Sequence, residues 1–148
     1  MISLLCSVMS IACGTNLEHN NYFNNAISVT SVYDGDTIKI AYPGLPEELG
    51  KLSVRVRGVD TPELRGKCTS EKKKAQLSKK FTKNIIEKNG NKVILENMTW
   101  DKYGGRVLAD VYIIEKTKIG YTKINLSNMI IKSGHGRKYD GNKRSNWC

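Results

Sequence analysis

The chain has 148 residues, of which 39% are hydrophobic and 26% are charged, so its size and composition are those of one globular domain and exclude a multidomain architecture. Its 24 Lys and Arg residues outnumber its 14 Asp and Glu residues, for a net charge of +10. This excess favours nucleic acid as a partner, because neutralising phosphates releases condensed counterions. An anionic membrane, or a basic surface that only aids solubility, is also compatible with the charge, which places nucleic acid only slightly ahead.

Residues 1–13, MISLLCSVMSIAC, are apolar and uncharged, and they are too short to span a membrane. They predict an export signal, although the usual Lys or Arg at its start is missing; a disordered start is the alternative. The sequence around Cys13 loosely resembles a lipoprotein processing site, which would lipidate Cys13 and attach the protein to a membrane. Residues 14–25 are polar and Asn-rich, as in a linker, so the folded domain is expected at 26–148. We therefore expect a secreted, periplasmic or envelope-bound protein, with lipoprotein attachment as the minority alternative.

Three runs in the first half of the domain alternate or group their apolar residues as strands do: 26–33, 37–42 and 51–59. Asp34-Gly35-Asp36 separates the first two runs and predicts a tight hairpin turn. In the third run Arg55 and Arg57 point away from the apolar face.

The period changes to that of a helix over 70–88, where Leu77, Phe81 and Ile85 recur every fourth residue. Two more strands are predicted at 92–98 and 106–114, and a short helix at 125–133, followed by a basic, irregular tail. Three strands, a helix, two strands and a helix indicate a β-rich α+β domain. A small closed or partly open barrel carrying helices fits this order, because closure removes exposed sheet edges.

None of the four cysteines forms a C-x-x-C pair, which argues against a structural zinc site. Removal of the leader would leave Cys68 and the terminal Cys148. They are expected to form a disulfide in an oxidising compartment, or to remain two free thiols in a cytosolic protein.

The acidic residues of two short motifs, DGDT at 34–37 and DTPE at 60–63, are informative in combination. Asp36, Asp60 and the Thr61 carbonyl offer hard oxygen ligands, which suit Ca²⁺ or a similar cation. Glu63 is near enough to hold a water beside such a metal. Arg55 and Arg106 add planar, permanently charged groups that grip phosphate oxygens. These are the parts that a phosphodiester hydrolase requires.

Four segments, VYDGDTIKI, VRVRGVDTPE, the lysine-rich helix and DKYGGRVLADVY, together resemble the staphylococcal nuclease (thermonuclease) family between Ile27 and Tyr139. The ending Y-D-G-x-K-x-x-x-W-C, together with Cys68, resembles small exported bacterial members and supports a Cys68–Cys148 bridge. The resemblance implies a five-stranded OB-type barrel with about three helices. It also implies a calcium-dependent endonuclease that acts on DNA and RNA and leaves 3′-phosphate and 5′-hydroxyl ends.

The resemblance implies a role for each matching residue. The expected calcium ligands are Asp36, Asp60 and the Thr61 carbonyl; the expected catalytic residues are Arg55, Glu63 and Arg106; the expected substrate contacts are Lys102, Tyr103 and Tyr139. Glu63 would deprotonate or orient the attacking water. The chain departs from the family pattern where Gly105 stands before Arg106, which affects the reach of that arginine.

Two other functions remain open on the sequence alone. One is a non-catalytic nucleic-acid-binding OB module, although such relatives usually lack one or more of the acidic and arginine residues present here. The other is a basic envelope protein whose charge serves lipid or polymer attachment. A monomer is expected in each case.

Overall fold

The computed structural model describes residues 25–46, 50–102, 104–144 and 146–148. The predicted leader, with Cys13, nearly all of the linker, and Tyr103 lie outside the described residues. The elements in chain order are β1 (Ile27–Asp34), β2 (Thr37–Ala41), β3 (Lys51–Val56), β4 (Val59–Asp60), α3 (Thr69–Lys88), β5 (Lys92–Trp100), β6 (Val107–Thr117), β7 (Gly120–Asn125), α4 (Leu126–Lys132) and β8 (Arg137–Lys138).

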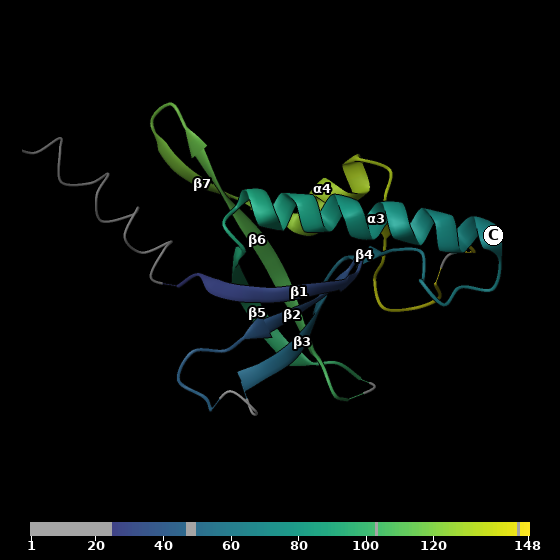
Figure 1. Cartoon of the computed structure of the whole chain (residues 1–148), viewed down its shortest axis with the longest axis horizontal. Coiled ribbons are helices and arrows are strands. Elements are labelled where there is room, and N and C mark those ends of the chain that lie inside the picture. The colour runs from purple at the N-terminus through teal and green to yellow at the C-terminus, as the bar shows by residue number, and fades with distance from the viewer. Residues whose placement is uncertain (1–24, 47–49, 103, 145) are drawn as a thin grey trace, which may run out of the picture.

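Five strands close into a barrel, as predicted. The sheet order is β3-β2-β1-β5-β6-β7, and β3, at one end of the sheet, also pairs in parallel with β6, which closes a ring. β1, β2, β3, β6 and β5 therefore form the ring, and β7 extends β6 as a hairpin outside it (Figure 1). The interior is filled by branched aliphatic side chains, among them Ile38, Ile40, Val54, Val93 and Val111, each fully buried.

Helix α3 runs across one side of the barrel, and α4 packs near it (Figure 1). The buried side of α3 consists of Ala75, Ser78, Thr82 and Ile86, whereas Leu77 is 57% exposed. Of the apolar residues expected on this side, Phe81 and Ile85 are partly buried against the core, and Leu77 is the one that points away. Small and hydroxyl-bearing residues face the barrel because the helix approaches the backbone of the β1–β2 turn closely.

Two short strands were not predicted. β7 pairs with β6 from Gly120 to Asn125, and every one of its residues is at least partly exposed, so it lacks the buried face that gives a strand its pattern. β8 pairs with β4 within the tail expected to be irregular.

The expectation of about three helices is corrected to two, α3 and α4, within the described residues. The tail beyond Gly134 forms no helix there, because it forms β8 and then runs to a disulfide at Cys148.

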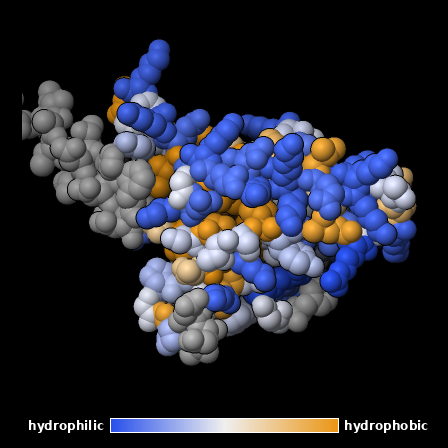
Figure 2. Space-filling model, viewed as in Figure 1, coloured by the Kyte–Doolittle hydropathy of each residue, from blue (hydrophilic) through white to orange (hydrophobic). Residues whose placement is uncertain are grey.

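The surface above α3 is strongly hydrophilic (Figure 2). Its exposed cations are Lys72, Lys73, Lys74, Lys80, Lys83 and Lys88. In the part of the chain that the structure describes, no helix has the length and apolar character needed to cross a membrane.

Candidate active site

The turn between β1 and β2 is held in place by helix α3. Thr82 Oγ1 donates a hydrogen bond of 2.7 Å to the Gly35 carbonyl. A Cβ atom at Gly35 would lie 1.9 Å from Ser78 Oγ, so only glycine permits this approach. The two carboxylates that flank the turn, Asp34 and Asp36, are therefore fixed by the packing of the helix.

Asp36 is almost fully buried and connects three segments. Its Oδ1 accepts a hydrogen bond from Thr37 Oγ1 at 3.1 Å, and its Oδ2 accepts one from the Thr61 backbone N–H at 3.1 Å. Arg55 Nη2, from β3, lies 3.2 Å from the same Oδ2. A buried carboxylate needs such partners, because desolvation without them is costly.

Asp60, at the end of β4, is fully buried and faces the same arginine. Arg55 Nη2 lies 3.6 Å from Asp60 Oδ1. Two buried carboxylates therefore share one guanidinium group. The sequence-predicted residues Asp36, Arg55 and Asp60 are brought together at one end of the barrel, and Thr61 is next to them through its hydrogen bond to Asp36.

Glu63 reaches this cluster through an arginine that the sequence did not single out. Arg144 donates from Nε to Asp60 Oδ1 at 2.6 Å, from Nη2 to the Thr61 carbonyl at 2.9 Å, and from Nη1 to the Glu63 carboxylate. Burial alone would lower the pKa of the Arg144 guanidinium, but the hydrogen bonds and charges of Asp60 and Glu63 raise it above its ordinary value. Arg144 is therefore charged at every physiological pH.

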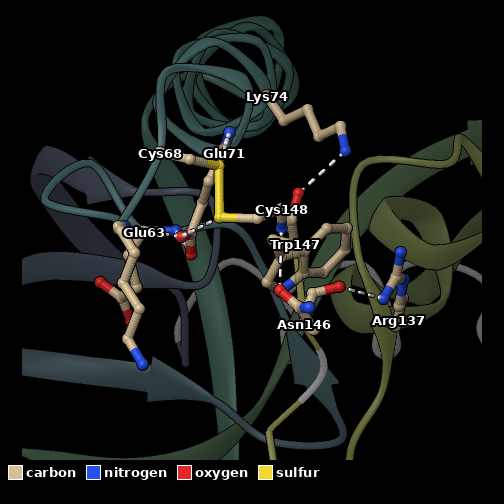
Figure 3. The surroundings of a disulfide bond; sticks show 9 residues. Glu63, Cys68, Glu71, Lys74, Arg137, Asn146, Trp147 and Cys148 are labelled. Carbon is tan, nitrogen blue, oxygen red and sulfur yellow. Dashed lines mark hydrogen bonds between the residues drawn. A yellow bond between two sulfur atoms is a disulfide. The ribbon is translucent and has the colours of Figure 1, made fainter.

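Residues 146–148 close one side of the cluster. Trp147 is 6% exposed, and its Nε1 donates to Asp60 Oδ2 at 2.9 Å. Arg137 stacks over the indole ring at 4.1 Å, and Lys74 Nζ donates to the Trp147 carbonyl at 2.9 Å. Figure 3 shows the indole lodged between Arg137 and the disulfide that joins Cys68 to Cys148.

Asp34 is a further acidic residue of the site that the sequence analysis took only as part of a turn. Its Oδ1 is buried without a hydrogen-bond partner. Burial, and after it the negative charges of Asp36 and Glu63, raise the pKa of Asp34 to about 7. A bound cation would pair with this unsatisfied oxygen and reduce the repulsion among the neighbouring carboxylates. The set of oxygen donors therefore fits a hard divalent metal.

Because the pKa of Asp34 is higher in the folded than in the unfolded chain, the folded state holds a proton that the unfolded state has released between about pH 4 and 7. Proton binding by Asp34 therefore stabilises the folded state. The stabilisation is complete below the pKa of Asp34 in the unfolded chain and is lost as the pH rises through its pKa of about 7 in the folded chain. Without calcium, Asp34→Asn should therefore raise the free energy of unfolding at pH 8, on the order of 1–3 kcal/mol, and by less at pH 5.5.

Urea unfolding in chelator at the two pH values measures this effect. The matched control is Asp140→Asn, because Asp140 is exposed and hydrogen bonds from Asn142 lower its pKa. That control should give no gain at pH 8. Equal effects of Asp34→Asn at both pH values would contradict the role assigned to the Asp34 charge.

The other sequence-predicted residues lie around this cluster. Arg106 is ion-paired with Asp101 and lines a cavity of about 320 Å³ with Thr37 and Ser53; within the described residues, no ion pair joins Arg106 to the acidic cluster. Lys102 Nζ donates to the Gly141 carbonyl at 2.9 Å. The Tyr139 ring lies 5.8 Å from the Arg55 guanidinium carbon, on the accessible side of the site.

A second cavity of about 590 Å³ opens beside the cluster. Its wall carries Glu63 and Arg144 together with Arg65 and Lys67. A carboxylate capable of proton transfer thus faces a space with basic walls, where a phosphodiester would be attracted electrostatically. The arrangement can bind a phosphate, hold a cation and orient a water molecule.

Arg144 and Trp147 were missed because the motifs that point to chemistry are all short-range. A signal did exist: a Cys68–Cys148 bridge places residues 144–147 near Glu63, which precedes Cys68 by only five positions.

Comparison with known proteins adds one finding. The family model described as staphylococcal nuclease homologue matches residues 53–146. This match covers more than half of the chain and includes Arg55, Asp60, Glu63 and Arg144. No curated protein matches the chain significantly.

Proposed function

The chain belongs to the staphylococcal nuclease homologue family of nuclease-like or nucleic-acid-binding OB-fold domains, and from this premise we propose that it is a calcium-dependent endonuclease acting on DNA and RNA. The expected products carry 3′-phosphate and 5′-hydroxyl ends. The observation that carries the proposal is the buried Arg55 guanidinium, shared by Asp36 and Asp60 beside a cavity that Glu63 and two exposed cations line.

Asp36, Asp60 and the Thr61 carbonyl would hold the metal. Bound calcium would supply Lewis-acid chemistry by polarising a phosphoryl oxygen. The cluster suits a divalent ion, because three carboxylates (Asp36, Asp60 and Glu63) pair with two guanidinium groups, with Asp34 beside them, and leave an excess of negative charge.

Glu63 is the general base or water-orienting residue of this proposal. Its side chain is 36% exposed and borders the cavity, so it can accept a proton from a water molecule positioned for attack on phosphorus. Arg55 donates to the non-bridging phosphate oxygens, whose negative charge grows as the five-coordinate transition state forms. Arg106, which lines the cavity of about 320 Å³, is proposed to contact the same phosphate once its pair with Asp101 opens.

A non-catalytic nucleic-acid-binding module is the second candidate, since the family includes such domains. The exposed lysines of α3, on a surface that Figure 2 shows to be hydrophilic, suit either function. The retention of Arg55, Asp60 and Glu63 in one cluster favours catalysis, because binding alone gives no reason to bury two carboxylates around one arginine.

Arg55→Lys separates the two candidates. Lysine keeps the charge but lacks the planar fork, so the rate of cleavage of a labelled DNA oligonucleotide should fall roughly 100-fold, with little change in its binding affinity. The matched control is Arg65→Lys, because Arg65 is exposed on the cavity rim and should tolerate the same change. Wild-type protein that binds the oligonucleotide but never cleaves it in calcium would support the binding module instead.

We also propose that the protein acts as a monomer outside the cytoplasm. The Cys68–Cys148 disulfide supports this compartment, because such bonds persist in oxidising surroundings. Membrane attachment through a lipidated Cys13 remains part of the proposal, and mass spectrometry of the mature N-terminus would test it.

A further inference from the structure

We propose that Arg144 is a built-in cation of the active site, which occupies the oxygens proposed to bind calcium and must be displaced before the metal can bind. Arg144 thereby sets the calcium affinity of the site. The inference rests on the proposed function, since it concerns the same set of ligands.

The contacts of Arg144 coincide with the proposed metal ligands. Its Nε donates a hydrogen bond to Asp60 Oδ1 at 2.6 Å, and its Nη2 donates one to the Thr61 carbonyl at 2.9 Å. Trp147 Nε1 donates a hydrogen bond to the other carboxylate oxygen, Asp60 Oδ2, at 2.9 Å. Two of the three proposed ligand groups are therefore already engaged by donors that belong to the C-terminal segment.

A guanidinium group and a calcium ion cannot share these oxygens. Calcium binds oxygen at about 2.3–2.6 Å in a compact shell, whereas the planar fork of Arg144 spreads its partners across Asp60, Thr61 and Glu63. The positive charge of Arg144 would also repel a divalent ion at this distance.

The C-terminal segment is anchored on both sides of Arg144. Before it, the Tyr139 backbone N–H donates to the Gly58 carbonyl at 3.1 Å and β8 pairs with β4. After it, Trp147 is buried and Cys148 is bonded to Cys68. These anchors hold Arg144 at a high local concentration beside the ligands, which makes it an effective competitor.

Displacement does not require the anchors to break. The Arg144 side chain is 39% exposed, and it borders the cavity of about 590 Å³ beside Glu63 and Lys67. The guanidinium can therefore rotate into this space while Trp147 and the disulfide stay in place. Calcium binding is thus coupled to the release of one side chain.

The test is calorimetric titration of the full chain with calcium chloride. Arg144→Gln should bind calcium at least about tenfold more tightly than wild type, because the competing charge is gone. The matched control is Lys143→Gln, which removes an equal charge from the neighbouring exposed residue and should change the affinity less than about twofold. Equal or weaker calcium binding by Arg144→Gln would overturn the proposal.

Structural damage cannot imitate the expected result, since a disordered site loses affinity. Arg144→Lys keeps the charge without the three-point contact and should give an affinity between those of wild type and Arg144→Gln; tighter binding than Arg144→Gln would contradict the proposal. If the wild type cleaves DNA in calcium but Arg144→Gln binds no more tightly, this inference alone fails. If no variant binds calcium, the proposed metal ligands are wrong and the inference fails with them.

Discussion

Glu63→Gln should lower the rate of DNA cleavage by roughly 10²–10⁴-fold, the usual contribution of a positioned general base. The glutamine keeps the shape of the side chain but cannot accept a proton from water. Because Glu63 is 36% exposed and its carboxylate contacts Arg144, the free energy of unfolding should change by less than about 1 kcal/mol. Single-turnover cleavage of a labelled oligonucleotide measures the effect on the chemical step.

Glu87→Gln is the control for this substitution. Glu87 is exposed on α3, and its one ion pair within the described residues is with Lys83, one turn away. The Glu87→Gln variant should therefore cleave DNA at the rate of wild type. An undiminished rate for Glu63→Gln would remove Glu63 from the mechanism. The remaining candidate acceptor for a proton would then be Asp34, the carboxylate whose pKa is raised to about 7.

Loss of the disulfide should produce the largest change in stability. Cys68 and Cys148 are 80 residues apart in the sequence, and a cross-link that closes a loop of this length stabilises a fold by about 4.5 kcal/mol, chiefly by restricting the unfolded chain. The double variant Cys68→Ser/Cys148→Ser should therefore lose most of the stability of a domain this small. The C-terminal segment that carries Trp147 should be the first part to detach.

Urea unfolding of the double variant and of wild type, each with and without reductant, measures this loss. Reduced wild type should unfold at the same urea concentration as the double variant. The variant should not respond to reductant. A difference below about 1 kcal/mol between oxidised and reduced wild type would show that packing, rather than the cross-link, holds the C-terminal segment.

The barrel was predictable because its strands alternate or group apolar residues over short stretches. Ile38, Ile40 and Val54, for example, are apolar positions of two predicted strands, and all are fully buried. β7 lacks such a pattern because it stands outside the barrel with both faces partly exposed. The face of α3 was misjudged at Leu77, since the helix presents Ser78 and Thr82 to the turn at Gly35 rather than its largest apolar residues.

The residues of the candidate site were likewise predictable where local sequence places them, and not where a long-range contact does. Asp36, Arg55 and Asp60 lie on or beside three consecutive strands of the chain, β2, β3 and β4, so local motifs are enough to place them near one another. Arg144 and Trp147 contact Asp60 across 84 and 87 residues, and nothing in their local sequence marks them for that contact. The cross-link from Cys148 to Cys68 was the one sequence feature that pointed to this contact; in the structure the pairing of β8 with β4 adds to it.

The central claim, a calcium-dependent nuclease, is tested most directly by incubating the wild-type chain with plasmid DNA and with single-stranded RNA, in calcium and then in chelator. We expect both nucleic acids to be cut in calcium, to fragments with 3′-phosphate and 5′-hydroxyl ends, and neither to be cut in chelator. Salt-sensitive binding without any cutting in calcium would contradict the claim, as would cutting that chelator leaves undiminished.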